Sequence, residues 1–281
     1  MQALPKIPGY ELVKSLGGGL LTQVFSARDC ASDAACAVKV LRPDWEDQPT
    51  AVKLLQREAR AGLAVQHPHL VRVLEAHVTR PPYFLVMELL SGESVRTRLR
   101  RDYRLEPATA LWIARQSAEA LAALHRAGFL HGDIKPDNIR LVGNGTAILI
   151  DLGFAHRPGE NDSFHAKGYV LGTINYLAPE LCASDPEADP KSDLFSLGVT
   201  LFEMLTGRLP FPPGPLEETF RRRGSEPPLD IRRYAAGLPS ALIALVERLL
   251  ARRPKDRPSA AAVVHQLIAL EIAVLRRRRS A

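Results

Sequence analysis

The chain has 281 residues, of which 46% are hydrophobic and 24% are charged, and its net charge at pH 7 is +6. These values are ordinary for a globular protein with an ample core, and the length suits one large or two small domains. The three cysteines are odd in number and scattered, which excludes a disulfide framework and predicts a reducing, cytoplasmic setting.

The first ninety residues have the pattern of a strand-rich lobe. Met1 leads almost directly into this pattern, so no signal peptide is expected. Glycines between the first two apolar segments indicate a hairpin, and a helix over about residues 50–65 ends before Pro68. We expect a small β-rich lobe over about residues 10–90. Its predicted strands are Tyr10–Leu16, Gln23–Arg28, Ala35–Leu41, Val71–His77 and Tyr83–Leu89.

The remainder of the chain is predicted to be mainly helical, over about residues 91–270. Pro107 begins a helix with one apolar face, and Gly128 ends it. Leu194–Leu205 is apolar almost all round, which predicts a helix in the middle of this lobe. Ala260–Leu275 is also apolar, but it is short for a bilayer and is interrupted by polar residues. We interpret it as a buried terminal helix.

Two arginine runs carry much of the positive charge. Arg221–Arg223 is interpreted as solvated surface, and residues 271–281 as a basic tail. No transmembrane segment and no nucleic-acid partner are expected. A weak contact with an anionic surface is left open for the four arginines of the tail, Arg276, Arg277, Arg278 and Arg279.

The most informative segment is His131–Asn138, followed thirteen residues later by Asp151. Phosphoryl transfer needs a carboxylate that orients the nucleophilic hydroxyl and a lysine that offsets charge on the moving group. It also needs an amide oxygen and a second carboxylate that hold Mg²⁺. Asp133, Lys135, Asn138 and Asp151 fit these four roles in that order.

On these residues the chain resembles the eukaryotic-like (Hanks-type) Ser/Thr protein kinases, particularly the compact bacterial members. The resemblance extends over nearly the whole chain and implies a catalytic domain at residues 10–270. It implies a bilobal α+β fold, with a small β-rich N-lobe and a larger helical C-lobe. It also implies ATP and Mg²⁺ (with Mn²⁺ as a possible substitute) as cofactors, and a protein substrate with a Ser or Thr acceptor.

The same resemblance assigns individual residues. Those with catalytic roles are Asp133, Lys135, Lys39, Glu58 and Thr173, with Lys39 paired to Glu58. The residues implied around the nucleotide are Leu16, Gly17, Gly18, Gly19, Val24, Ala37, Lys39, Met87, Glu88 and Leu90. Met87 is at the position behind the adenine pocket, and the hinge begins at Glu88. The implied metal ligands are Asn138 and Asp151.

Two other functions are kept as alternatives. Gly132, where most protein kinases have Arg, also occurs in the aminoglycoside-type small-molecule kinases. Residues 172–180 argue for the protein kinases, because they match the peptide-docking end of an activation segment. The match implies a bond from Thr173 to Asp133 and Lys135, an ion pair between Glu180 and Arg257, and support of the catalytic loop by Asp193. A pseudokinase, a nucleotide-binding scaffold on the same fold, is expected to lack one of the catalytic residues; none is lacking.

Four departures from the family pattern lead to further expectations. Thr22 stands at the third glycine position of the phosphate loop, and Leu152 replaces Phe after the metal aspartate. Gly62 is expected to leave a thin spot in the packing behind Glu58. Gly132 provides no cation, which makes this a non-RD kinase with an HGD catalytic loop. A phosphate on Ser163 of the activation segment is then left with cations of the segment itself, His156, Arg157 and Lys167, and is expected to have a small effect. Thr173, the other hydroxyl residue considered, is the less favoured site because its hydroxyl is needed in the catalytic centre.

Overall fold

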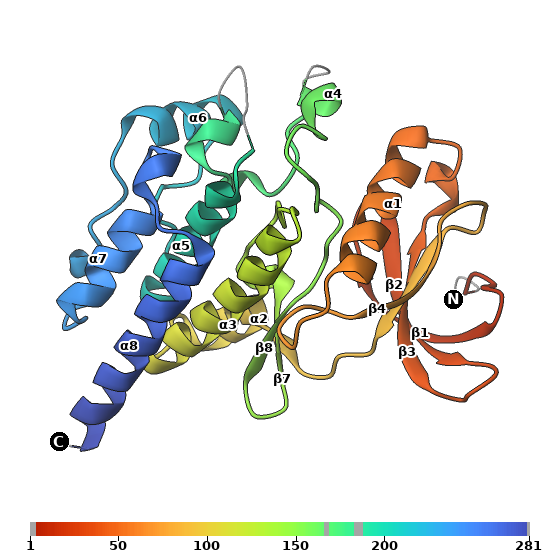
Figure 1. Ribbon diagram of the computed structural model, residues 1–281, viewed down its shortest axis with the longest axis horizontal. Coiled ribbons are helices and arrows are strands. Elements are labelled where there is room, and N and C mark those ends of the chain that lie inside the picture. The colour runs from red at the N-terminus through yellow and green to blue at the C-terminus, as the bar shows by residue number, and fades with distance from the viewer. Residues whose placement is uncertain (1–3, 166–168, 183–187, 280–281) are drawn as a thin grey trace.

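The computed structural model describes residues 4–165, 169–182 and 188–279, with the backbone alone at Ser163, His165, Leu216 and Leu275–Arg279. Two lobes are visible in Figure 1, a sheet with one long helix and a larger group of helices. The expected bilobal α+β fold is therefore confirmed.

The N-lobe is a five-stranded antiparallel sheet in the order β1-β2-β3-β5-β4. All five predicted strands and the predicted helix are present. The strands are β1 (Tyr10–Gly18), β2 (Thr22–Asp29), β3 (Ala35–Leu41), β4 (Val73–His77) and β5 (Phe84–Glu88), and the helix is α1 (Pro49–Ala64).

Strand β3 is buried on both faces, and this fixes the orientation of Lys39. Alternate side chains of a strand point to opposite faces. Val38 packs with Phe25 on one face of the sheet, whereas Ala37 and Leu41 pack with α1 on the other. Lys39 lies between Ala37 and Leu41 in the alternation, and it therefore points to the side of the helix.

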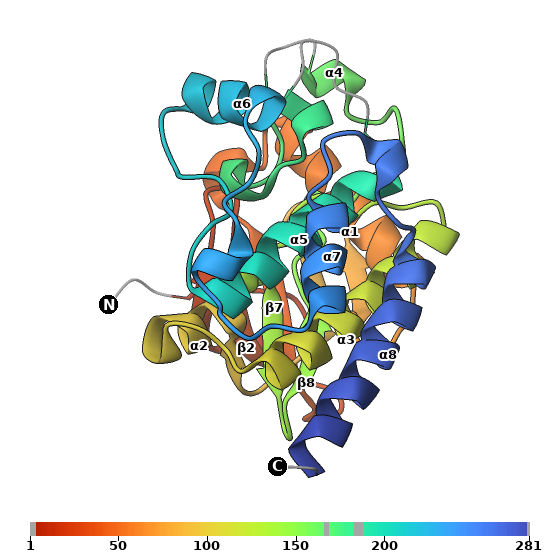
Figure 2. The same ribbon diagram turned by 90° about the vertical axis from the view of Figure 1, so that its left-hand side faces the viewer.

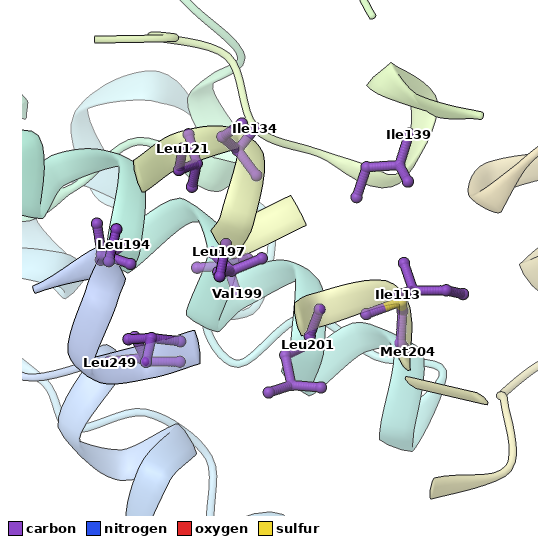
Figure 3. Packing of buried hydrophobic residues seen from close by; sticks show 14 of the residues in the cluster. Ile113, Leu121, Ile134, Ile139, Leu194, Leu197, Val199, Leu201, Met204 and Leu249 are labelled. Atoms are coloured by element: carbon purple, nitrogen blue, oxygen red, sulfur yellow. The ribbon is translucent and has the colours of Figure 1, made fainter. Parts of the chain in front are cut away.

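The C-lobe is built around α5 (Pro190–Thr206). Nearly every residue of this helix is buried, which agrees with the apolar run seen in the sequence. Figure 3 shows Leu194, Leu197 and Leu201 of α5 among side chains of the neighbouring helices. The other helices are α2 (Val95–Asp102), α3 (Pro107–Arg126), α4 (Asp162–His165), α6 (Leu216–Ser225), α7 (Ser240–Leu249) and α8 (Ala260–Arg279). A small sheet joins the lobes: β6 (Glu93–Ser94), β7 (Ile139–Val142) and β8 (Thr146–Leu149).

The terminal helix α8 lies along α3 (Figure 2). Val263, Leu267 and Leu270 are buried, but Ile268 and Ile272 on the opposite side are 40% and 47% exposed. The expectation of a buried terminal helix is therefore correct for one face only. In the part of the chain that the structure describes, no helix is long and apolar enough to cross a membrane.

Gly62 on α1 corrects a second expectation. It is buried, and a β-carbon placed on it would overlap Cγ2 of Val73 on β4. The side chain of Val73 therefore fills the space that was expected to be thin. Leu152 packs next to it and is fully buried, as expected for a residue behind Glu58.

Candidate active site

The catalytic loop between α3 and β7 is held from below by Asp193 of α5. The Asp193 carboxylate accepts hydrogen bonds from the backbone N–H groups of His131 (2.9 Å) and Gly132 (3.0 Å), and it contacts Nε2 of His125 at 2.8 Å. Burial alone would raise the pKa of Asp193, but these donors, His125 first among them, lower it. The predicted support of the loop by Asp193 is therefore present.

Asp133 is 3% exposed, and its carboxylate is surrounded by donors. Lys135 Nζ is 2.6 Å from Oδ2, Asn138 Nδ2 is 2.9 Å from the same oxygen, and the Thr173 N–H donates to Oδ1 at 2.9 Å. Lys135 Nζ also donates to the Thr173 hydroxyl at 2.6 Å. The predicted contacts of Thr173 are confirmed, and they join the catalytic loop to the end of the activation segment.

A second charged group links the two lobes. Lys39 Nζ lies 2.7 Å from Glu58 Oε2 and 2.7 Å from Asp151 Oδ1, so the predicted Lys39–Glu58 ion pair is present. Burial alone would lower the pKa of Lys39, but the carboxylates of Asp151 and Glu58 more than offset this and raise it. Burial raises the pKa of Glu58, and the Lys39 ammonium opposes that rise. The charged pair is the form that this geometry favours, because two acceptors satisfy one ammonium.

Asp151 differs from its two partners in being reachable from solvent. Its side chain is 40% exposed, compared with 9% for Lys39 and 3% for Glu58. The Lys39 ammonium lowers the pKa of Asp151 to about 2, so this carboxylate is ionised at neutral pH. Its φ of 66° is in the left-handed region, a strained conformation for a residue with a β-carbon that often marks a functional site.

The residues expected around adenine come together on one side of the sheet. Val24 of β2 is paired with Lys39, and Ala37 of β3 is paired with Met87 of β5. Ala37 and Met87 are buried in one apolar cluster, and Val24 and Leu90 pack against it. Strand β5 ends at Glu88, the first residue of the expected hinge.

The glycine cluster lies at the turn of the β1–β2 hairpin, and the structural reason for a glycine differs from one position to the next. Gly17 has a φ of 136°, and a β-carbon on Gly18 would lie 2.6 Å from the Thr22 carbonyl oxygen. Both are therefore required by the hairpin itself. Gly19 has open space around its Cα, although its N–H already donates to the Thr22 carbonyl at 2.9 Å. Leu16 precedes them on β1 and is 45% exposed.

Two sets of polar contacts hold residues 173–180 in place, one at Glu180 and one at Tyr176. Glu180 Oε1 lies 2.6 Å from Nη1 of Arg257, whose side chain is fully buried, so this predicted ion pair is confirmed. In addition, the Tyr176 hydroxyl donates to Glu203 Oε2 at 2.5 Å, and Arg96 Nη1 lies 2.6 Å from Glu203 Oε1. Sequence reasoning missed Arg96 and Glu203. Glu203 could have been noticed from the sequence, because it is the one acidic residue in the apolar run Leu194–Leu205 and a buried carboxylate needs a partner.

The backbone conformation at position 132 requires a glycine. Its φ is 79°, and a β-carbon would lie 2.7 Å from the Phe154 carbonyl oxygen. A small pocket lies beside Gly132, lined by residues of the catalytic loop, of the activation segment and of the chain just after residues 172–180. The lining residues are Gly132, Phe154, His156, Asn161, Val170, Leu171 and Leu181.

His156 corrects the expectation that it is an available cation. It is 4% exposed, its Nδ1–H donates to the Phe154 carbonyl at 2.8 Å, and burial lowers its pKa. Two helix residues that the sequence did not single out, Arg57 and Arg60 of α1, do reach the activation segment. Lys167 and the side chains of Ser163 and of Arg276–Arg279 lie outside the described part of the structure.

Comparison with known proteins agrees with this geometry. Residues 10–268 match the family described as "Protein kinase domain". The chain is 36% identical over 260 residues to the serine/threonine-protein kinase pkn2 of Myxococcus xanthus, covering 90% of this chain and 31% of that protein. It is 33% identical over 258 residues to the serine/threonine-protein kinase PknB of Mycobacterium leprae, covering 90% and 41%. It is 34% identical over 202 residues to PrkC of Bacillus subtilis, covering 72% and 31%.

The chain thus spans about a third to two-fifths of the length of these relatives. The family match covers most of the chain, and it coincides with the lobes that carry the paired Lys39 and Glu58 and the loop around Asp133. The chain therefore belongs to the protein kinase family, as a kinase domain of the Hanks-type serine/threonine class found in bacteria.

Proposed function

We propose that this protein transfers the γ-phosphoryl group of ATP to Ser or Thr hydroxyls of a protein substrate, with Mg²⁺ as the preferred metal. The observation that carries the proposal is the triangle formed by Asp133, Lys135 and Thr173. Thr173 is the second residue of the segment, residues 172–180, that matches the peptide-docking end of a protein-kinase activation segment. The catalytic carboxylate is thus connected to the expected site of a peptide hydroxyl.

In the proposed reaction, the substrate hydroxyl oxygen forms a bond to the γ-phosphorus, and the bond from that phosphorus to the β–γ bridging oxygen breaks. Asp133 orients the hydroxyl and accepts its proton, and Lys135 offsets the negative charge of the transferred group. Lys39 contacts the α- and β-phosphates, and Glu58 holds Lys39 in place. Most of the catalysis comes from positioning and charge, as is general for phosphoryl transfer.

The residues present suit a magnesium ion that is shared with the nucleotide. Among the described residues no group of three His, Cys, Asp or Glu side chains could hold a metal alone. Asp151 has one oxygen bound by Lys39 and a side chain open to solvent, and Asn138 lies beside Asp133. One carboxylate and one amide oxygen are the few protein ligands that Mg²⁺ takes when phosphates supply others. When bound, the metal would neutralise charge on the β- and γ-phosphates.

The two alternatives differ in what they need from residues 172–180. A nucleotide-binding scaffold has no use for the contacts of Thr173 with both catalytic residues. An aminoglycoside-type kinase has no use for a peptide loop anchored by Glu180 and Arg257. Both pairs of contacts support protein phosphorylation.

The proposal is tested by incubating the protein with labelled ATP, Mg²⁺ and a generic protein substrate and measuring the transferred label. An aminoglycoside is tested as the acceptor in parallel. Asp133→Asn is expected to lower kcat by at least about a hundredfold, or about 2.7 kcal/mol, while ATP affinity changes little. Lys39→Met should also be inactive but folded. Near-native turnover of Asp133→Asn would refute the assigned role, and labelling of the aminoglycoside alone would favour the small-molecule alternative.

A further inference from the structure

Two arginines of α1 connect the helix that carries Glu58 with the activation segment. Arg57 Nη1 donates to Asn161 Oδ1 at 2.8 Å, and Arg57 also bonds the Glu160 carbonyl oxygen. Arg60 Nη2 lies 2.7 Å and 2.6 Å from the two carboxylate oxygens of Glu160. Arg57 and Arg60 are one helical turn apart and thus on the same face of α1. In Figure 1 the segment carrying α4 approaches this helix from the C-lobe.

Burial makes the Arg57 contact important. Its side chain is 5% exposed, and burial lowers its pKa, which the nearby Glu160 opposes. A buried guanidinium without acceptors is strongly destabilising, because its charge and its N–H groups lose the hydrogen bonds that water would provide. Its described acceptors belong to the segment, and the Phe164 ring lies 5.1 Å from its guanidinium carbon. Movement of the segment away from α1 would therefore leave Arg57 without these partners.

The activation segment presents Glu160 on a tight turn that forms without phosphorylation of the segment. The Glu160 N–H donates to the Arg157 carbonyl at 3.1 Å, and the Glu160 carboxylate accepts from the Arg157 N–H at 2.9 Å. Pro158 and Gly159, with a Gly159 φ of 81°, occupy the central positions as a type II turn requires. The turn thus places the Glu160 carboxylate opposite Arg60.

We propose that Arg57 and Arg60, with Glu160 and Asn161, form a built-in clamp that holds α1, and through it Glu58, in the position that pairs with Lys39. The Glu160 carboxylate supplies the anionic partner that a phosphorylated residue supplies in kinases with an arginine at the position of Gly132, and the Asn161 amide oxygen adds a neutral acceptor. The clamp makes Arg60 and Glu160 positioning residues for the proposed phosphoryl transfer, on which this inference rests. It also implies that activity does not require phosphate on the segment.

A charge exchange tests the clamp in the full chain. Arg60→Glu and Glu160→Arg should each lower kcat/KM by at least about tenfold, and the double variant should exceed either single variant by at least about threefold. Recovery is expected to be partial, because Arg57 and the Arg157 N–H still lack the Glu160 carboxylate. Both positions are partly exposed (44% and 24%), so the variants are expected to fold. Glu247→Arg breaks an ion pair with Arg232 on the distant C-lobe surface with the same change in charge, and it should stay within about twofold of the wild type.

Hydrogen exchange of the α1 amides gives a readout that does not depend on turnover. Exchange should rise in both single variants, fall back in part in the double variant and remain unchanged in Glu247→Arg. Phosphatase-treated wild type should keep its activity within about tenfold. Single variants that equal the wild type, or a double variant without recovery in either readout, would overturn the clamp. So would a loss of about a hundredfold on phosphatase treatment. If the variants show the expected exchange pattern but the wild type transfers no phosphate, the clamp would stand and the proposed function would be refuted.

Discussion

At the scale of single residues, the site depends on a few groups whose environment is set by burial. Lys39 and Glu58 are buried and charged because each has a partner, whereas Asp151 belongs to the same group but is partly exposed. That difference places the ionised carboxylate on the side that solvent can reach, where the proposed nucleotide would bind. The low pKa of Asp151, about 2, keeps it anionic throughout the working range of pH.

The exposed carboxylate leads to a prediction about metal dependence. ATP with Mg²⁺ should raise the melting temperature of the wild type more than ATP with EDTA. Asp151→Ala should remove this difference, because the proposed metal ligand is lost. At a ligand concentration of about 100 times Kd, the stabilisation at stake is about 2.7 kcal/mol. Equal stabilisation of the wild type in Mg²⁺ and in EDTA would show that the proposed metal site is wrong.

Gly132 leads to a prediction about backbone strain. Gly132→Ala should lower the free energy of unfolding by about 1–2 kcal/mol, because it forces a β-carbon into the left-handed region and against the Phe154 carbonyl. Gly128→Ala is the matched control, since Gly128 has a φ of 78° but nothing within 4 Å of the added carbon. Denaturant titration should find Gly132→Ala the less stable of the two. Equal stability of the two variants would mean that the contact with Phe154 relaxes without cost.

At the scale of secondary-structure elements, the position of α1 is decided by its contacts with the sheet and with the activation segment. Its apolar residues pack on the sheet, Gly62 meets Val73 of β4, and Arg57 and Arg60 reach the activation segment. Residues close in sequence thus have separate roles, since Glu58 points to Lys39 while Arg57 points to Asn161. A displacement of α1 would disturb all of these contacts together.

The close contact at Gly62 gives a prediction for the helix. Gly62→Ala should lower stability by about 1–3 kcal/mol through overpacking against Val73, and it should lower kcat by moving α1. Gly224→Ala makes the same substitution within α6, where nothing lies within 4 Å, so it should be neutral or stabilising by up to about 1 kcal/mol. Thermal unfolding of both variants checks this contrast. A Gly62→Ala protein as stable as the wild type would contradict the packing described here.

At the scale of the whole molecule, two buried histidines link stability to pH. His131 is fully buried and His156 is 4% exposed, and burial lowers the pKa of both. The unfolded chain binds more protons than the folded one below the ordinary histidine pKa of about 6.5. The stabilising effect is therefore complete above that pH and decreases as pH falls toward the lowered values.

The free energy of unfolding should accordingly decrease between about pH 7 and pH 5, by up to about 1.4 kcal/mol per pH unit for each histidine. Denaturant titrations at several pH values measure this slope. His156→Asn, which cannot titrate, should show a smaller slope than the wild type. An unchanged slope in that variant would exclude His156 as a contributor.

The sequence by itself predicted the five strands and the long helix of the N-lobe, and it placed three of the candidate catalytic and metal-binding residues in one loop. Strand β3 was predicted at its observed bounds. A strand's limits can be read locally, because they depend on its own apolar residues and on the polar residues that flank them. The spacing of Asp133, Lys135 and Asn138 is likewise local, since a single loop positions all three. The family resemblance extended this to distant pairs such as Lys39 with Glu58 and Glu180 with Arg257.

Only the tertiary structure decided which surface charges meet and how space is filled. Nothing near Arg57 or Arg60 in the sequence indicates that their acceptors lie about a hundred residues away, at Glu160 and Asn161. The Gly62 contact was also misjudged, because the side chain that fills the space belongs to β4. Long-range contacts depend on packing between elements, and periodicity within one element carries no information about the partner that packs against it.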